Sequence, residues 1–265
     1  MTFKEWFFGG NYKINPGFDN PSVNMQWKLP HILVLLTCIA AIIAIAFIFR
    51  KKSDKARKIV LWVLVGAILA FEIIRRVKNI MSNLIMDNVA LDDWLYILLP
   101  RPWCAIACWS LIIAAIFNKK YLYNVASFTA LLCAIIFFAY PSAGFNNALM
   151  EFDNIYSIST HALLLVTSIT MITLKYTDFR YKDFWKDMIC LAVVFVYACI
   201  EIWILKISEN PLYFLPMEGN EIQEIIGVGN VLYVIVYVAF VALFINLFYL
   251  INDRKNVFKK RKKSK

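Results

Sequence analysis

Charged residues are scarce in this chain of 265 residues, since Lys, Arg, Asp and Glu together make up only 17% of it. All six cysteines lie inside apolar segments, no C-x-x-C spacing occurs, and the basic C-terminal tail is the one low-complexity segment. This pattern argues against a disulfide framework or a metal site, so we expect no disulfide, metal or cofactor. The first long apolar run starts at about Pro30 and precedes its cationic cluster, so we also expect no cleavable signal peptide.

Hydrophobic residues dominate instead, at 61% of the chain. Apolar segments recur at close to the ~20 residues that a bilayer requires, and they are too long and too unalternating for a β-barrel. We therefore predict an all-α, polytopic membrane protein, a seven-transmembrane helical bundle. The predicted spans are residues 30–49, 59–74, 94–117, 121–140, 155–174, 187–205 and 225–251. They form one transmembrane domain (30–251) between an extracytoplasmic, interfacial N-terminal segment (1–29) and a basic cytoplasmic tail (252–265).

The basic residues are distributed unevenly between the loops. Most of the 28 Lys and Arg residues fall after the first, third and fifth predicted spans and in the tail, whereas the other loops carry mainly Asp and Glu. The positive-inside rule then predicts an N-terminus outside and a C-terminus inside. The net charge of +10 is thereby explained by topology and by attraction of the tail to anionic lipid, so we expect no nucleic-acid partner.

The third predicted span is interrupted by the sequence Leu98-Leu99-Pro100-Arg101-Pro102-Trp103-Cys104. Proline lacks a backbone donor, disfavours helix in the residue before it and suits the first turn of a new helix. We predict a discontinuous span with Arg101 near a cap and Cys104 in the first turn of the second part. There the helix dipole and the neighbouring cation favour a thiolate. Because non-helical backbone at membrane depth needs protein or a watery cavity around it, the break is a candidate site.

Ionisable side chains inside the predicted spans fall at one depth. At 1.5 Å per residue all of them lie in the outer half of the bilayer, where such groups usually mark function. We therefore predict one polar pocket that opens toward the outer leaflet. Its candidate residues are His31, Glu72, Arg101, Cys104, His161 and Glu201.

Several of these residues also have a purely structural interpretation. His31 could be interfacial, and Glu72 could form a local ion pair with Arg75 and Arg76, which follow it by three and four residues. Arg101 could extend to the outer surface and hold a phospholipid headgroup.

The two later candidates are interpreted from their neighbours. His161 could be a hydrogen-bonded packing residue, although the nearby Ser157, Ser159 and Thr160 could orient its imidazole. Glu201 has no cation within a turn except Lys206, which favours a position in the pocket.

With Leu99-Pro100-x-x-x-Cys104 on the third span and His161 on the fifth, the chain resembles the YwaF-type integral membrane proteins of bacteria. These share a fold with the eukaryotic transmembrane cysteine acyltransferase that remodels ether phospholipids. The androgen-induced-gene hydrolases of fatty-acid esters, which use a threonine–histidine pair, are similar more distantly. A His at the start of the first span (Lys28-Leu29-Pro30-His31) and a Glu in the second (Phe71-Glu72) extend the resemblance over the seven spans.

The chain departs from that family pattern in two places. Such proteins often read Leu-Pro-Leu-His-x-Cys, whereas Arg101 and Pro102 fill the two middle positions here. The asparagine-rich stretch typical of the sixth span and the following loop is also weak, with Glu201 and Asn210 its nearest equivalents. The resemblance implies a multi-pass protein of a cell membrane, in this case a bacterial plasma membrane.

These features predict a membrane-embedded lipid acyltransferase, transacylase or hydrolase. His161 would deprotonate Cys104, whose thiolate would attack a lipid ester carbonyl and form a thioester. Helix N–H groups or Arg101 would stabilise the oxyanion, and a lysolipid hydroxyl or water would accept the acyl group. The expected partners are membrane phospholipids or other acyl lipids.

Two other functions remain open at this point. A small-molecule-binding or transport protein, such as the substrate-capture subunit of an importer, would use a pocket aromatic such as Trp103 rather than Cys104. A membrane scaffold would use the polar groups only to hold helices together. A retinal-type receptor is disfavoured because the seventh predicted span has no lysine for a Schiff base.

Overall fold

The computed structural model describes residues 6–7, 27–85, 99–100, 103–139, 145, 152–200, 227 and 229–263. Within these residues the chain forms seven α-helices and one short 3-10 helix, and no strand. Four helices are long and apolar enough to cross a membrane: Leu29–Phe49, Lys120–Ala139, Phe152–Thr173 and Asn230–Asp253. The all-α, membrane-spanning character is therefore confirmed, while the number of seven spans stays a prediction.

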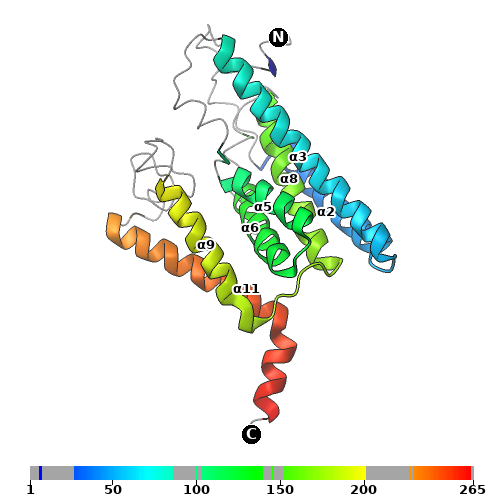
Figure 1. The fold of residues 1–265 in the computed structure, drawn as a ribbon, viewed down its shortest axis with the longest axis vertical. Coiled ribbons are helices and arrows are strands. Elements are labelled where there is room, and N and C mark those ends of the chain that lie inside the picture. Colours follow the sequence, from blue (N-terminus) through cyan, green and yellow to red (C-terminus); the bar gives the residue numbers. More distant parts are fainter. Residues whose placement is uncertain are drawn as a thin grey trace. The chain divides into compact units, whose positions relative to one another are not determined.

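The chain divides into two compact units, the first ending at Thr177. The helices of this first unit are α2 (Leu29–Phe49), α3 (Asp54–Ile85), α5 (Trp103–Phe117), α6 (Lys120–Ala139) and α8 (Phe152–Thr173). Helices α6 and α8 are its most deeply buried candidate spans and pack along each other. Helix α5 packs against α6 and α3, and α2 and α3 each pack against α8 (Figure 1).

Small buried side chains recur on both α5 and α6, which pack against each other. Ala126, Ala130 and Ala134 recur every four residues on α6 and are all buried. Helix α5 presents its own buried small residues, among them Ala107 and Ala114. Between helices in a membrane, where lipid is as apolar as the side chains, such close van der Waals packing is a main source of association.

Three loops of the first unit meet at one end of the bundle. Arg57, in the first turn of α3, donates from Nη1 to the carbonyl oxygen of Leu174 (3.2 Å), just beyond α8. The ring of Tyr123, in the first turn of α6, lies 5.3 Å from that of Tyr176. The α2–α3 turn, the α5–α6 turn and the end of α8 are therefore neighbours, as the charge pattern predicted.

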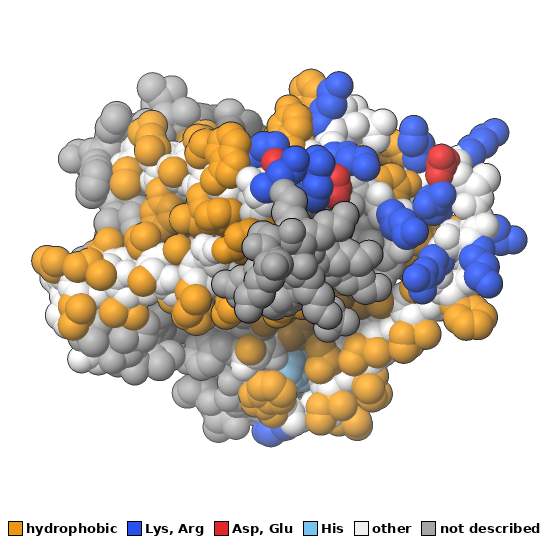
Figure 2. Space-filling model, turned by 90° about the horizontal axis from the view of Figure 1, so that it is seen from below, with side chains coloured by type: hydrophobic (Ala, Val, Ile, Leu, Met, Phe, Trp, Pro, Cys, Tyr) orange, Lys and Arg blue, Asp and Glu red, His pale blue; other side chains and the backbone are white. Residues whose placement is uncertain are grey.

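Basic side chains gather at helix ends, and hydrophobic side chains cover the helix flanks (Figure 2). The flanks contain many exposed large apolar residues, including Phe47, Val63 and Ile116. An apolar flank with charged ends is the distribution that a bilayer requires.

The second unit begins at Asp178. It contains the 3-10 helix η2 (Tyr181–Asp183) and the α-helices α9 (Phe184–Cys199) and α11 (Asn230–Lys263). Helix α11 packs against α9 and η2. The Tyr249 hydroxyl donates to the buried Asp187 carboxylate (2.8 Å), and the Tyr181 amide donates to Asp253 (2.9 Å).

Two helices differ in length from their predicted spans. Helix α3 extends to Ile85, well beyond the predicted end of the second span at residue 74. The prediction stopped at Arg75, Arg76 and Lys78, whereas each of these cations forms an ion pair in the bundle. Helix α11 continues to Lys263, through the segment predicted to be the tail, because Lys and Arg are good helix formers.

Candidate functional site

Glu72 is the centre of a buried polar cluster that connects three helices. Its side chain on α3 is 0% exposed. The carboxylate accepts hydrogen bonds from Arg76 one turn along, from Trp109 Nε1 on α5 (3.1 Å) and from the Tyr156 hydroxyl on α8 (2.6 Å). Arg75 Nη2 lies 3.9 Å from the same carboxylate. The local ion pair considered from the sequence is present, but the contacts to α5 and α8 make it part of an interhelical network.

Aromatic rings fix the positions of both guanidinium groups in this Glu72 cluster. Arg75 Cζ lies 5.5 Å from the centre of the Tyr156 ring, and Arg76 Cζ lies 5.1 Å from that of Trp109. A cation over an aromatic face is attracted by the ring quadrupole, more strongly when water is excluded. Each arginine is therefore held by a ring whose polar atom also binds Glu72.

Cys104 is the second residue of α5. Leu99 and Pro100 are non-helical, which agrees with a helix that begins after the two prolines. The thiol is free and half-buried, and it lies within electrostatic range of Arg75 and Glu72. The cation predicted to neighbour it, Arg101, lies outside the described residues, as do Pro102 and Glu201.

His161 lies on α8 with a defined orientation. Its Nδ1 atom is 2.7 Å from the backbone oxygen of Ser157. A carbonyl oxygen can only accept, so Nδ1 carries the proton and the lone pair is on Nε2. The ring stacks on Phe137 of α6, with centroids 3.7 Å apart and planes at 9°. The main-chain oxygen of Ser157 thus orients the imidazole.

The positions of Cys104 and His161 can be compared along α6. Cys133 and Phe137 are one turn apart on that helix. Cys104 lies within electrostatic range of Cys133, and His161 stacks on Phe137. The two candidates therefore approach the same part of α6 from α5 and from α8. Between these two described residues no hydrogen bond is present, so their pairing stays a prediction.

A model of the TMEM164 family matches residues 26–252, which is most of the chain. The chain belongs to the TMEM164 family. No curated protein and no solved structure matches it. Membership of the TMEM164 family is consistent with the resemblance to the eukaryotic transmembrane cysteine acyltransferase, and it fits a role in membrane lipid chemistry. The closer resemblance to the bacterial YwaF type stays a prediction.

His31 of this TMEM164-family chain is buried rather than interfacial, with 0% of the residue exposed. The amide of Trp27 donates to its Nδ1 atom (3.2 Å), so the ring proton is on Nε2, the opposite tautomer to that of His161. The His31 ring lies 4.8 Å from that of Phe145 and 6.0 Å from that of Phe138. The ring centre of Phe138 in turn lies 5.3 Å from that of Phe137. Both histidines therefore border one aromatic cluster.

Trp103 connects the start of α5 to α6. Its indole Nε1 donates to the backbone oxygen of Thr129 (3.4 Å), and the side chain is half-buried. This contact positions the first turn of α5, and with it Cys104. In the described part of the chain no group of three His, Cys, Asp or Glu side chains could hold a metal ion.

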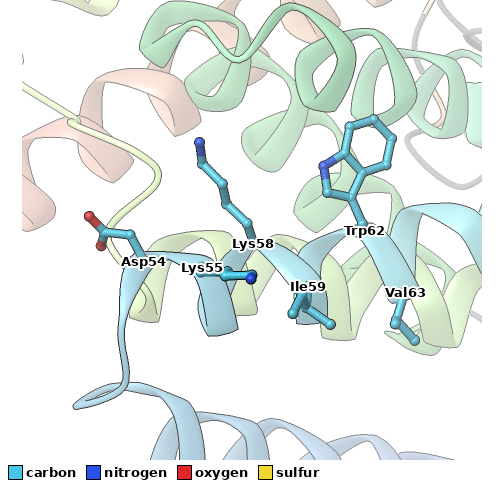
Figure 3. A pocket seen from close by; sticks show the side chains of 6 residues that line it. All are labelled: Asp54, Lys55, Lys58, Ile59, Trp62 and Val63. Carbon is cyan, nitrogen blue, oxygen red and sulfur yellow. The ribbon is translucent and has the colours of Figure 1, made fainter.

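An open hollow of about 630 Å³ lies at the other end of α3. Figure 3 shows its lining, which is Asp54, Lys55, Lys58, Ile59, Trp62 and Val63. Glu72 is ten residues beyond Trp62, or about 15 Å along the helix. None of the predicted site residues lines this hollow.

Two partners in the Glu72 cluster cannot be predicted from sequence spacing. Trp109 and Tyr156 are separated from Glu72 by 37 and 84 residues, so no local spacing relates them to it. Arg75 was considered only as an intrahelical partner. The signal in the sequence is a pair of arginines close to a glutamate in an apolar chain, because such groups need further polar contacts when they are buried.

Proposed function

We propose that this TMEM164-family protein is a membrane lipid acyltransferase, transacylase or hydrolase that carries the acyl group as a thioester on Cys104. The observation that carries the proposal is the place of this free thiol. It stands in the first turn of α5, within electrostatic range of the Glu72 cluster and at the same part of α6 as His161.

The surroundings of Cys104 suit a reaction in which negative charge develops. The first turn of a helix has backbone N–H groups without intrahelical acceptors, and the helix dipole adds a partial positive charge. The Arg75 guanidinium lies within electrostatic range of the sulfur. The N–H groups and Arg75 would stabilise the oxyanion of a tetrahedral intermediate.

His161 would act as the general base because its Nε2 lone pair is the one left open by the Ser157 contact. The imidazole takes the thiol proton, and the sulfur attacks the ester carbonyl. Collapse of the intermediate breaks the carbonyl–oxygen bond, and the imidazolium returns the proton to the departing lysolipid oxygen. A lysolipid hydroxyl or water then attacks the thioester by the reverse proton path and regenerates the thiol.

The proposal includes the membrane context of the site. We infer seven spans with the N-terminus outside and the C-terminus inside a bacterial plasma membrane, phospholipid or other acyl-lipid partners, and anionic lipid at the basic tail. The convergence of the α2–α3 turn, the α5–α6 turn and the end of α8 supports a shared side for these three loops. The Glu72 cluster would then lie toward the outer leaflet.

The test is direct detection of the acyl-enzyme. Purified full-length protein is incubated with phosphatidylcholine, quenched in acid and measured by intact-mass spectrometry. We expect an acyl adduct that hydroxylamine removes in the wild type and in Cys108→Ser, but not in Cys104→Ser. Cys108 is the matched control because it lies one turn along α5 and is also a free cysteine. His161→Gln should slow adduct formation by about 10²–10⁴-fold.

Equal adduct in the wild type and in Cys104→Ser would overturn the proposal. A wild type that forms no adduct and turns over no lipid, yet binds a small molecule through Trp103, would favour the importer subunit instead.

A further inference from the structure

Several donors converge on the single carboxylate of Glu72. Arg75 and Arg76 both approach one carboxylate, which already accepts hydrogen bonds from Arg76, Trp109 and Tyr156. The neighbouring cation Lys78 has its own partner, Asp153 at the start of α8. The Glu72 carboxylate thus already has several donors, and a further buried cationic donor is costly unless another acceptor is supplied.

Arg76 contains such a donor. Its Nη1 atom donates to Glu72, while its Nη2 atom is buried and has no hydrogen-bond partner. Glu72 and Trp109 hold the guanidinium in one plane, so the open N–H groups have a fixed direction. Arginine presents its donors as a planar fork that matches the oxygens of a phosphate group.

The helices around the Glu72 cluster provide few anionic acceptors for Arg76. Among their described residues, α5 contains no charged side chain and α2 none either, and the one carboxylate of α8 is Asp153. An acceptor supplied from outside the protein is therefore the simplest complement to Arg76.

The depth of the cluster fits a lipid headgroup. Glu72 and Arg76 are 18 and 22 residues from Asp54 along α3, or about 27 and 33 Å. Since the hydrocarbon core is ~30 Å thick, a helix that enters near Asp54 reaches the opposite headgroup layer at this cluster. Cys104 lies within electrostatic range of Arg75 and Glu72 in the same region.

We propose that Arg76, with Arg75 beside it, forms a phosphate site that holds the phosphodiester of the substrate glycerophospholipid. In such a lipid the phosphate and the glycerol ester are only a few bonds apart. Binding of the phosphate by the arginines therefore presents an ester carbonyl to the neighbouring thiol. The role of this site rests on the proposed acyl transfer, whereas the binding of lipid to it can be measured without any turnover.

The experiment measures lipid binding without turnover. Full-length Cys104→Ser protein in detergent is titrated separately with phosphatidylcholine and with diacylglycerol of the same chains, and bound lipid is counted by native mass spectrometry. We expect phosphatidylcholine to bind about tenfold or more tightly, the difference that one charge-assisted pair supplies. Adding Arg76→Gln should abolish this preference and leave diacylglycerol binding unchanged.

Two further variants separate a phosphate site from a structural role. Arg57→Gln is the matched control, because this arginine lies at the other end of α3 and bonds a carbonyl of the protein. It should keep the preference. Glu72→Gln breaks the same ion pair as Arg76→Gln but raises the positive charge, so it should keep or strengthen the preference. If the Glu72–Arg76 ion pair has only a structural role, Glu72→Gln and Arg76→Gln should both lose the preference for phosphatidylcholine.

Equal binding of the two lipids to the parent protein overturns the inference, and so does displacement of phosphatidylcholine by millimolar inorganic phosphate, which would indicate a free-anion site. If Arg76→Gln does not fold, Arg76→Lys keeps the charge without the fork, and we expect a weaker preference in it. A Cys104 thioester without a headgroup preference overturns this inference alone. A preference without any thioester overturns the proposed function alone.

Discussion

At the scale of single residues, the contacts of Glu72 show what spacing can and cannot predict. Spacings of three and four residues identify Arg75 and Arg76 as neighbours on the same helix face, and both contacts are present. Trp109 and Tyr156 approach from other helices. Their contacts depend on how α3, α5 and α8 rotate against each other, which is decided by packing and not by any local pattern.

Removing the Glu72 carboxylate should destabilise the protein strongly. Glu72→Ala leaves the Arg76 guanidinium without its anion, a loss of about 3–5 kcal/mol in the free energy of unfolding. Thermal and denaturant unfolding in detergent measure it. Asp54→Ala is the control, because that carboxylate pairs with Arg57 but is 85% exposed, and it should cost well under about 1 kcal/mol. Equal losses would contradict the burial of the cluster.

The Ser157 side chain should be dispensable. Since His161 bonds to the main-chain oxygen of Ser157, the Ser157→Ala variant keeps the imidazole tautomer. We expect the rate of thioester formation to stay within about twofold of the wild type, against the loss of about 10²–10⁴-fold for His161→Gln. A large loss in Ser157→Ala would indicate that the hydroxyl orients the ring.

At the scale of helices, the sequence predicts apolar spans closely and polar helix ends poorly. The spans predicted at 30–49, 121–140 and 155–174 agree with α2, α6 and α8 to within three residues at each end. Helix α3 is longer than predicted because a hydropathy limit treats each cation as a boundary. Its cations are instead satisfied within the bundle by Glu72 and Asp153, so the helix continues.

The packing of α6 in the bundle should depend on its small residues. Ala130→Leu places a larger side chain where the residue is 0% exposed, which should cost about 1–3 kcal/mol. Ala40→Leu on the exposed flank of α2 makes the same change and should be nearly neutral. Unfolding midpoints of the two variants in detergent give the comparison. Similar midpoints would contradict the close packing.

At the scale of the whole molecule, the described candidate residues all belong to the first unit, which ends at Thr177. The charge pattern predicts which loops share a side, and contacts within this unit place three of them together. Composition alone did not predict a second unit with its own buried residues, such as Tyr249 and Asp187. Both units are equally apolar in sequence, and only the contact pattern separates them.

The predicted sidedness can be measured with single cysteines in exposed positions. Ser53→Cys and Lys119→Cys should react with a membrane-impermeant maleimide only when the inner face is accessible, and Lys28→Cys should react from outside. Labelling of inverted and right-side-out vesicles, compared with the parent protein, distinguishes the two faces. Reaction of residues 53 and 119 from opposite sides would contradict the bundle as described.

The opposite tautomers of the two histidines have a consequence for acid conditions. Trp27, just before α2, adopts a left-handed backbone conformation (φ 57°) that is unfavourable by about 1–2 kcal/mol for a residue with a side chain. Its amide is bound by the lone pair of His31. A second proton on the His31 imidazole places an N–H group opposite the Trp27 amide, so that this hydrogen bond is lost and the strained residue is released. A protonated His161 keeps its hydrogen bond to Ser157. At acid pH the segment just before α2 would thus lose its hydrogen bond to His31, whereas His161 would keep its hydrogen bond to Ser157.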